Sequence, residues 1–377
     1  MSRFVVVLAA WLALWWSVVG ALLAPVLPGG WGAVAALVLL TTLPLPIIVR
    51  GRRAGRVATA AQRVWLLRSF VYAQLLLPLA AVAGLLGAAF GAAFGAAGAA
   101  GMTGRGAMAV AAGVFAVLAL CGYAGSRRLV RTDIVARWDD LPPGLDGMRI
   151  AQISDTHVGP QTSRRHLAHV ARIAAESRAD LVVVTGDLVD DHAPDVAHYA
   201  AGLGALAAPL GVYAVAGNHD VYAGWPAVHE RLLALPLTVL VNEWRWLERN
   251  GARFALLGTG DPAGGRGGTE AGGPDLDRAL QGLPRDAFVI ALAHNPALWP
   301  ALAKRGVRLT LSGHTHWGQL AIPGLGWSLA SPFNAHAMGG YVEGESVLYV
   351  HPGSNYWGIP FRLGTPPEVA VIELRRA

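Results

Sequence analysis

Long stretches without a single charged side chain occupy the first third of this sequence. Residues 4–49, 69–104 and 106–126 contain no Asp, Glu, Lys or Arg. A helix needs about 20 apolar residues to cross the hydrocarbon core of a bilayer. A soluble helical bundle would carry charged outer faces, and these segments have none. We therefore predict a transmembrane α-helical bundle within residues 1–131. Its four expected helices span about 4–27, 31–49, 69–97 and 106–126.

Charge separates this region from the rest of the chain. Residues 1–137 hold 12 basic residues and one acidic residue, whereas residues 138–377 hold 18 basic and 23 acidic residues. The acidic balance of the second part argues against a nucleic-acid partner. Basic residues gather between the second and third spans and after the fourth, and positively charged loops stay in the cytoplasm. We therefore expect a multi-pass protein of the inner cell membrane with a cytoplasmic C-terminal domain.

Two alternatives bear on the apolar region. A cleaved signal peptide over residues 1–27 would have only Arg3 as its basic region and too long an apolar core. Small residues recur every four positions at Gly87, Gly91 and Gly95, a spacing that permits close helix packing. We expect this packing inside the bundle, with a dimer interface as the alternative. The expected spans contain no acidic residue or histidine, which disfavours an ion-coupled transporter.

Beyond a linker at 132–146, residues 147–377 alternate between strand-like and helix-like segments. The expected strands are 148–154, 181–186, 212–217, 252–258, 288–294, 307–313, 346–353 and 368–374. Residues 163–177 have helical spacing, and residues 259–286 have the composition of a surface loop. Nearly continuous apolar strands imply sheets that are covered on both faces. The expected class is therefore α/β or α+β with layered sheets.

Metal-binding types of side chain follow five of these strands. They are Asp155 and His157, then Asp187 and Asp190, then Asn218, His219 and Asp220, then His294, and finally His314 and His316. Ligands of α/β sheets gather beyond the carboxyl ends of the strands, so we expect the five loops to meet at one point. Carboxylate, imidazole and amide donors without a thiolate suit divalent Mn, Fe or Zn.

In this order the motifs resemble those of the calcineurin-like metallophosphoesterases. The resemblance covers roughly residues 147–377 and rests on D-x-H, G-D-x-x-D, G-N-H-D, His294 and G-H-T-H. The chain is most similar to the bacterial membrane-associated branch, judging by S-D-T-H-V-G, G-H-T-H-W-G-Q and the tail from Arg362 to Glu368. The resemblance implies a four-layer αββα sandwich, two sheets flanked by helices. Trp317 stands where a small residue is expected, and we expect it to narrow the mouth of the site.

The resemblance also implies a dinuclear metal centre. One divalent ion would be bound by Asp155, His157 and His316, the other by Asn218, His294 and His314, with Asp187 bridging both. Two such ions can clamp both sides of an in-line phosphoryl displacement, in which a bridging hydroxide attacks.

Three further polar residues are expected to support this centre. His219 adjoins a ligand, and we expect it to protonate the leaving oxygen or to hold the phosphoryl group. Asp220 is expected to orient His219 through a hydrogen bond. Asp190 is a weaker candidate for outer support of the ligands.

The expected function is hydrolysis of phosphomonoester, phosphodiester or pyrophosphate bonds beside the membrane bilayer. One alternative is a lipid-specific hydrolase, acting on a nucleotide-linked lipid pyrophosphate or a phospholipid head group. Trp225, Trp317, Trp327 and Trp357 would then meet acyl chains, although a core position is the commoner fate of tryptophan. A second alternative is a non-catalytic membrane receptor or scaffold that retains a metal site. The oligomeric state is left open.

Overall fold

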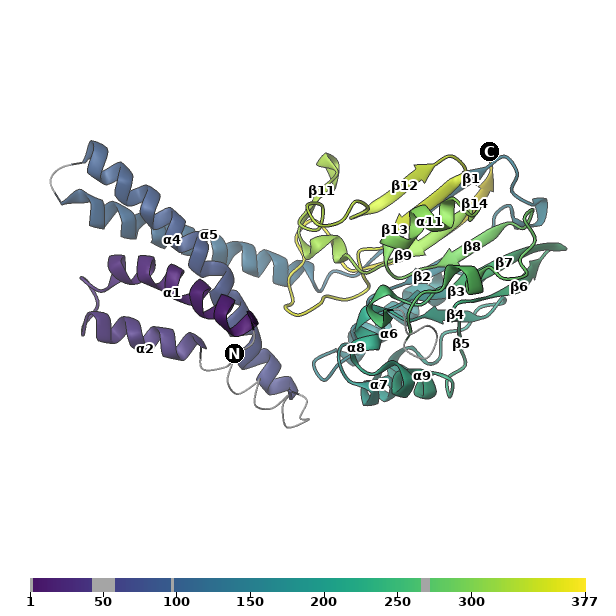
Figure 1. Ribbon diagram of the computed structural model, residues 1–377, viewed down its shortest axis with the longest axis horizontal. Coiled ribbons are helices and arrows are strands. Elements are labelled where there is room, and N and C mark those ends of the chain that lie inside the picture. Colours follow the sequence, from purple (N-terminus) through teal and green to yellow (C-terminus); the bar gives the residue numbers. More distant parts are fainter. Residues whose placement is uncertain (1–2, 43–57, 96–97, 266–271) are drawn as a thin grey trace. The chain divides into compact units, whose positions relative to one another are not determined.

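The computed structural model describes residues 3–42, 58–95, 98–265 and 272–377 (Figure 1). The chain divides into two compact units, residues 1–120 and residues 121–377. The helices of the first unit are α1 (Arg3–Leu23), α2 (Trp31–Thr42), the π-helical turn η1 (Gln62–Leu67), α4 (Arg68–Phe94) and α5 (Ala99–Gly125). The end of α5 belongs to the second unit.

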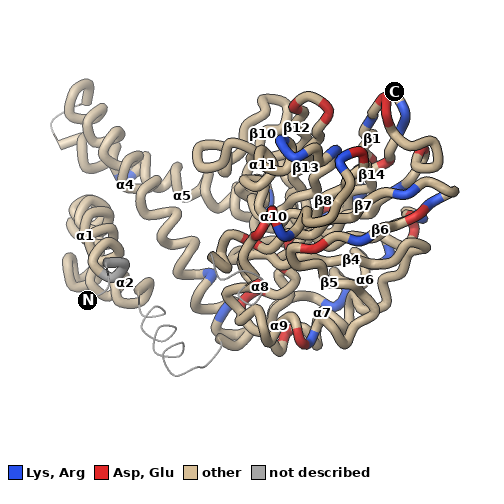
Figure 2. The backbone as a smooth tube through the Cα atoms, turned by 45° about the vertical axis from the view of Figure 1, so that its right-hand side comes forward, with Lys and Arg blue, Asp and Glu red and all other residues tan. Residues whose placement is uncertain are grey.

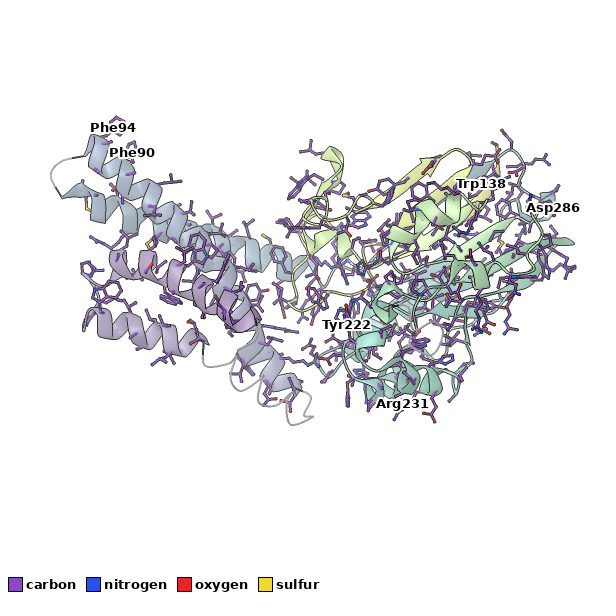
Figure 3. All side chains as sticks on the ribbon, in the orientation of Figure 1. Phe90, Phe94, Trp138, Tyr222, Arg231 and Asp286 are labelled. Carbon is purple, nitrogen blue, oxygen red and sulfur yellow. The ribbon has the colours of Figure 1, made fainter. Side chains whose placement is uncertain are left out.

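Three helices in the described part of the chain are long and apolar enough to cross a membrane. They are residues 6–23, 62–94 and 99–125. The helices are almost free of charged residues in Figure 2, and Phe90 and Phe94 project outward from α4 in Figure 3. Of the expected span at 31–49, the structure describes a helix over residues 31–42, and the remainder lies outside the described residues. Helix α5 begins at Ala99, so Arg105 lies within this helix rather than between two spans.

The small-residue face of α4 packs inside this unit. A Cβ atom on Gly87 would lie 2.6 Å from the Cβ of Ala107 and 2.7 Å from the carbonyl oxygen of Thr103, both on α5. Gly91 would likewise collide with Thr103. These glycines therefore allow α4 and α5 to approach closely, which is the packing that the spacing predicted within the bundle.

Two six-stranded sheets form the body of the second unit. The first has the order β1-β14-β2-β3-β4-β5 and the second the order β12-β13-β9-β8-β7-β6. The strands of the first sheet are β1 (Val130–Trp138), β14 (Glu368–Arg376), β2 (Arg149–Ile153), β3 (Leu181–Thr185), β4 (Val212–Val215) and β5 (Thr238–Val239). Those of the second are β12 (Gly339–Glu343), β13 (Ser346–Val350), β9 (Leu309–Ser312), β8 (Val289–Leu292), β7 (Ala252–Gly258) and β6 (Glu243–Arg249).

Alternation along the strands produces four layers. In β3, Leu181 and Val183 join a buried cluster that includes Phe254 and Leu256 of the second sheet, while Val182 and Val184 join another on the opposite face. The outer face of the first sheet is covered by α6 (Arg164–Glu176), α7 (Val196–Leu203) and α9 (Trp225–Leu232). The second sheet packs similarly against α10 (Leu276–Ala279) and α11 (Trp299–Ala303). The predicted αββα sandwich is confirmed.

The expected linker at 132–146 is wrong over residues 132–138, because these residues belong to β1. This strand pairs in parallel with β14 from Val130–Glu368 to Trp138–Arg376. Its first residues alternate between half-buried positions, such as Thr132 and Ile134, and exposed positions, such as Arg131 and Asp133. The sequence of β1 alternates between apolar and polar residues as a strand should, but its charged residues made the segment resemble a linker.

Candidate metal centre

The strand ends bring the ligand candidates together at one edge of the sandwich. The contributing loops follow β2, β3 and β4 of the first sheet and β8 and β9 of the second. The fully buried Gln152 couples the two sheets there, since its side-chain amide donates to the Thr185 hydroxyl and to the Ser312 carbonyl, both at 2.9 Å. The five loops therefore leave the two sheets at a common point.

Five ligand candidates have left-handed backbone, which is uncommon for residues other than glycine. They are Asp155 (φ 52°), His157 (φ 40°), Asp187 (φ 51°), His314 (φ 73°) and His316 (φ 50°). Such conformations cost free energy and cluster at functional sites, where the surrounding structure imposes them. The backbone therefore turns each side chain away from the direction that its strand would give it.

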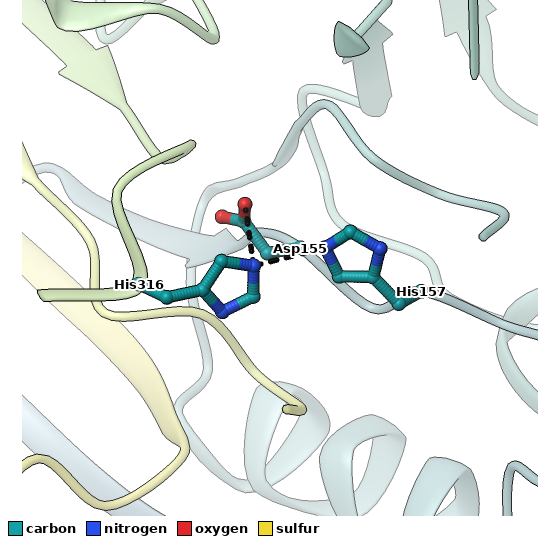
Figure 4. A group of neighbouring side chains, drawn as sticks. All are labelled: Asp155, His157 and His316. Carbon is teal, nitrogen blue, oxygen red and sulfur yellow. Dashed lines mark hydrogen bonds and ion pairs between the residues drawn. The ribbon is translucent and has the colours of Figure 1, made fainter. Parts of the chain in front are cut away.

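One donor group consists of Asp155, His157 and His316 (Figure 4). The Nε2 atoms of the two histidines face each other at 2.9 Å, and Nε2 of His316 lies 3.4 Å from Oδ1 of Asp155. Donors about 2.0–2.2 Å from a divalent ion lie roughly 3 Å from one another. The spacing is therefore that of ligands around a single ion.

A second group consists of Asn218, His294 and His314. The amide oxygen of Asn218 lies 3.1 Å from Nε2 of His294 and 2.7 Å from Nδ1 of His314. The other ring nitrogen of His294 donates to the Thr185 carbonyl at 2.7 Å. This hydrogen bond places the proton on Nδ1 and leaves the Nε2 lone pair directed toward the group.

Asp187 lies between the two groups. Its Oδ2 atom is 3.5 Å from Nε2 of His157 and 3.3 Å from Nε2 of His294. Gly217 packs against the Asp187 carboxylate so closely that a Cβ atom would overlap it, and a Cβ on Gly313 would similarly overlap Asp155. These glycines before Asn218 and His314 therefore let two loops close tightly around the acidic groups.

The donor set fits divalent metal ions. Oδ2 of Asp155 is fully buried and has no hydrogen-bond partner among the described residues. A buried carboxylate oxygen without a partner is costly unless a cation or donor satisfies it. A cation bound between the facing imidazole nitrogens and the carboxylate would satisfy the buried carboxylate oxygen that has no partner.

His219 lies at the edge of these groups, half-buried, with its ring centroid 4.6 Å from that of His157. Its backbone amide donates to Oδ1 of Asp187 at 2.7 Å, and its Nδ1 donates to the carbonyl of Asp190 at 2.6 Å. The Asp190 carboxylate also lies 3.5 Å from Nδ1 of His157. Asp190, rather than the next residue along the chain, therefore orients the His219 ring.

The predicted role of Asp220 is wrong. Its carboxylate accepts hydrogen bonds from the backbone amides of Leu188, Val189 and Gly217 at 3.2, 3.0 and 2.9 Å. In the described part of the chain it forms no hydrogen bond with the His219 ring. Burial, followed by the charge of Asp187, raises the pKa of Asp220 to about 7. Asp220 thus ties two ligand loops together through their backbone.

The tryptophans divide into two pairs. Trp317 is half-buried: its indole donates to the Val350 carbonyl at 2.8 Å, and its ring packs beside the second sheet. Its expected narrowing of the mouth stays a prediction. Trp225 is in the core. Trp327 and Trp357 are exposed, and the Trp357 ring lies 5.8 Å from that of His219.

Arg362 is a residue that the sequence analysis did not connect to the centre. It is 1% exposed. Its guanidinium donates to the carbonyls of His316, Pro352 and Asn355, and one of its nitrogens lies 2.8 Å from Nδ1 of His316. Burial lowers its pKa to about 9, while the charge of Asp155 acts in the opposite direction. One planar group therefore fixes the loop that follows β9 against the loop that follows β13.

Arg362→Lys is expected to weaken metal binding without unfolding the second unit. An ammonium lacks the planar fork that reaches three carbonyl groups, so the His316 ring loses its fixed orientation. Loss of an outer partner of a metal ligand typically costs about 10–100-fold in affinity. Metal titration of the metal-depleted protein measures this change. Arg231→Lys, at an exposed position, is the control, and equal affinities in the two variants would contradict the role of Arg362.

A second overlooked residue, Asp261, lies in the segment expected to be a surface loop. It is 1% exposed; Oδ1 accepts a hydrogen bond from the Ala263 amide at 2.8 Å, and Oδ2 is buried without one among the described residues. Burial raises its pKa, opposed by the nearby His294 and His314. Part of residues 259–286 therefore reaches the candidate centre.

Without a cation, the donor groups share protons instead. Burial alone would raise the pKa of Asp187, but His294 and His157 hold it well below its usual range. The same carboxylate raises the pKa of His294 well above its ordinary value, despite burial. Burial and then the Arg362 charge keep the pKa of His316 well below normal. The His294–Asp187 pair is therefore charged and mutually stabilising at neutral pH.

Metal-depleted protein is expected to lose thermal stability as the pH rises. A histidine whose pKa is raised on folding stabilises the native state fully below its unfolded value of 6.5, and this contribution disappears as the pH passes through the folded pKa. Each kcal/mol lost corresponds to about 2–4 °C in Tm for a domain of this size. Scanning calorimetry with a chelator between neutral and alkaline pH measures the slope. His294→Gln should flatten it, and an unchanged slope would rule out this pair as the cause.

Known proteins with related sequences identify the family of the second unit. Residues 148–318 match the family model described as calcineurin-like phosphoesterase. The chain is 33% identical over 275 residues to a transmembrane protein with metallophosphoesterase domain from Danio rerio, covering 70% of this chain and 62% of that protein. It is 32% identical to the uncharacterised metallophosphoesterase YkuE of Bacillus subtilis, covering 62% of this chain and 82% of that protein. A solved dimetal phosphatase from Danio rerio aligns over 55% of this chain and 88% of its own, at 15% identity and a TM-score of 0.39.

The chain therefore belongs to the calcineurin-like phosphoesterase family, and its second unit carries a metallophosphoesterase domain. The family binds divalent metals. The chain spans 62% and 55% of the lengths of its relatives from Danio rerio and Bos taurus. The matched segment contains all the ligand candidates and ends before Arg362.

Proposed function

We propose that this chain is a membrane-anchored phosphoesterase that holds two divalent metal ions, Mn, Fe or Zn, and hydrolyses phosphomonoester, phosphodiester or pyrophosphate bonds. The observation that carries the proposal is the gathering of seven donor side chains from five loops. Within each of the two groups, facing donor atoms lie 2.7–3.4 Å apart, and Asp187 stands between the groups.

Each part of the donor set has a task in this proposal. Asp155, His157 and His316 would hold one ion, and Asn218, His294 and His314 the other, with Asp187 shared. Bound there, the ions would supply Lewis acidity and lower the pKa of a water molecule that attacks phosphorus in line. The chain itself provides the fixed ligand positions, through the left-handed backbone and the closely packed glycines.

We expect His219 to act on the leaving group. The Asp190 carbonyl occupies Nδ1 of its ring, so Nε2 is the nitrogen available to the substrate. A protonated Nε2 can donate to the leaving oxygen or to a phosphoryl oxygen. The Trp357 ring beside His219 is half exposed, and this apolar surface next to the centre favours a lipid-linked phosphoester as the second candidate substrate.

Hydrolysis by the purified full chain in detergent tests the proposal. The assay contains Mn and either nitrophenyl phosphate, a phosphomonoester, or bis-nitrophenyl phosphate, a phosphodiester. Release of nitrophenolate is measured, and a chelator should stop it. A phospholipid or lipid pyrophosphate in mixed micelles tests the second candidate. Absence of turnover with all metals and substrates, in protein that still binds metal, would favour the non-catalytic receptor or scaffold.

Placement of the second unit in the cytoplasm, at the inner membrane, remains part of the proposal. It rests on the basic residues that flank the apolar helices, including the exposed Arg127 and Arg128 after α5. Reporter fusions to the C-terminus distinguish the two sides of the membrane. A reporter that is active only outside the cytoplasm would reverse the orientation.

A further inference from the structure

A surface of large apolar side chains lies directly after the last ligand candidates. We call residues 320–336 the apolar lobe; it contains β10 (Ala321–Ile322), the 3-10 helix η8 (Pro323–Leu325) and β11 (Trp327–Ser328). Its exposed side chains are Ile322 at 48%, Leu325 at 76%, Trp327 at 38%, Leu329 at 49% and Phe333 at 83%. Soluble surfaces seldom expose so many large apolar groups together, and such patches usually mark contact with a partner or a membrane.

The apolar lobe also lacks charge. No Asp, Glu, Lys or Arg lies between Arg308 and Glu343. Elsewhere in the second unit both signs of charge are spread over the strands and helices (Figure 2). Insertion of a charged side chain into a bilayer is costly, so this uncharged segment is the part of the unit that lipid would accept most readily.

The base of the apolar lobe is attached to the segment that contacts the end of α5. Leu320 bridges to Leu363, and the neighbouring Arg362 amide donates to the carbonyl of Gly122 at 2.8 Å. The Phe361 ring packs directly against Gly122. Gly122 belongs to the second unit and lies on the last turns of α5, whose residues 99–125 form a membrane-crossing candidate. The base of the apolar lobe is thus linked, through residues 361–363, to the C-terminal end of α5.

We propose that the apolar lobe inserts into the interfacial layer of the bilayer that the N-terminal helices cross. A membrane anchor keeps the lipid surface at a high effective concentration for any apolar patch on the attached domain. Tryptophan is enriched where a protein meets that surface, and phenylalanine and leucine line the buried faces of segments that lie in it. The same bilayer would then lie beside Trp357, which contacts Gln319 through hydrogen bonds of 2.8 and 3.0 Å at the base of the lobe.

Site-directed labelling of the full chain tests this contact without any substrate. The single cysteine, Cys121, is replaced by serine, and Leu325→Cys and Phe333→Cys are introduced separately for an environment-sensitive NBD label. The labelled protein is reconstituted into vesicles of phosphatidylcholine and phosphatidylglycerol, with and without doxyl-labelled lipid. Asp286→Cys and Arg231→Cys are matched controls at exposed polar positions that project from the second unit (Figure 3).

The labels on the apolar lobe are expected to emit at shorter wavelength than the controls and to lose most of their emission to doxyl lipid. Quenching at residues 325 and 333 that does not exceed that at 231 and 286 would overturn the proposal. Self-quenching that rises with protein density in the membrane, without quenching by doxyl lipid, would assign the surface to a second copy instead and would also overturn it. Because no turnover is measured, failure here leaves the hydrolase proposal untouched.

Discussion

Asp187→Asn is expected to remove both metal binding and phosphoester hydrolysis. This carboxylate is 2% exposed and lies 3.5 and 3.3 Å from the facing nitrogens of His157 and His294. Asparagine keeps the shape of the side chain but removes the negative charge that two cations would share. The repulsion between the two ions would then be less well compensated. We expect kcat/KM to fall by at least about a thousandfold, which corresponds to roughly 4 kcal/mol of transition-state stabilisation.

Metal content and turnover are measured together on purified protein. Asp286→Asn removes one carboxylate from an exposed position and should change neither quantity. Two tightly bound ions per chain in Asp187→Asn would show that this residue does not bridge. If activity is lost while both ions stay bound, Asp187 would instead position the His219 backbone. The Asp187 carboxylate accepts a hydrogen bond from the His219 amide at 2.7 Å.

His219→Ala is expected to retain the metal and to slow the hydrolysis of esters with poor leaving groups. The side chain is held by the Asp190 carbonyl at 2.6 Å and stands beside His157 without belonging to either proposed ligand set. General acid catalysis contributes typically about 10²–10⁴-fold, and this contribution grows as the leaving oxygen becomes more basic. Alkyl phosphates should therefore lose far more rate than nitrophenyl phosphate.

Comparison of the two substrate classes separates the two roles of His219. If nitrophenyl phosphate and an alkyl phosphate slow by the same factor, the residue holds the phosphoryl group and does not donate the proton. His219→Gln retains a hydrogen-bond donor and should partly restore the rate only in that case. Metal analysis of both variants must match the parent, because a loss of ions would place His219 among the ligands.

The layered α/β class was predictable because its strands are nearly uninterrupted apolar runs. All eight expected strands form, and β3 shows why: each residue from Leu181 to Thr185 is buried, with alternate side chains facing the other sheet and the helices. Strands at the edges of the sheets were not predicted. In β6, Trp244 and Trp246 alternate with Arg245 and other charged residues, so hydropathy does not mark the segment. The Asn250–Gly251 turn that joins β6 to β7 was a hairpin signal that the sequence analysis did not use.

The ligand candidates were predictable for a different reason. Each follows a buried strand, and parallel strands deliver their carboxyl ends to one edge, so sequence order alone predicts the convergence of Asp155, Asp187 and His294. Apart from Asp190, the residues that support those groups were not predictable. Arg362 comes from a loop 46 positions after His316 and has no periodic signal. Asp220 stands next to His219 in the sequence, but its carboxylate accepts hydrogen bonds from the Leu188 and Val189 amides rather than contacting the His219 ring.

The pairing of β1 with β14 determines when the domain can be completed. Thr132 and Glu368, which share a 2.6 Å hydrogen bond across this pair, are 236 positions apart. On the ribosome, β1 emerges immediately after α5, and its partner strand is made only after both sheets have otherwise been translated. Until then the edge of β2 also stays open, since β14 lies between β1 and β2. The first strand of the domain to be synthesised must therefore wait unpaired, and such a wait favours chaperone binding over early closure.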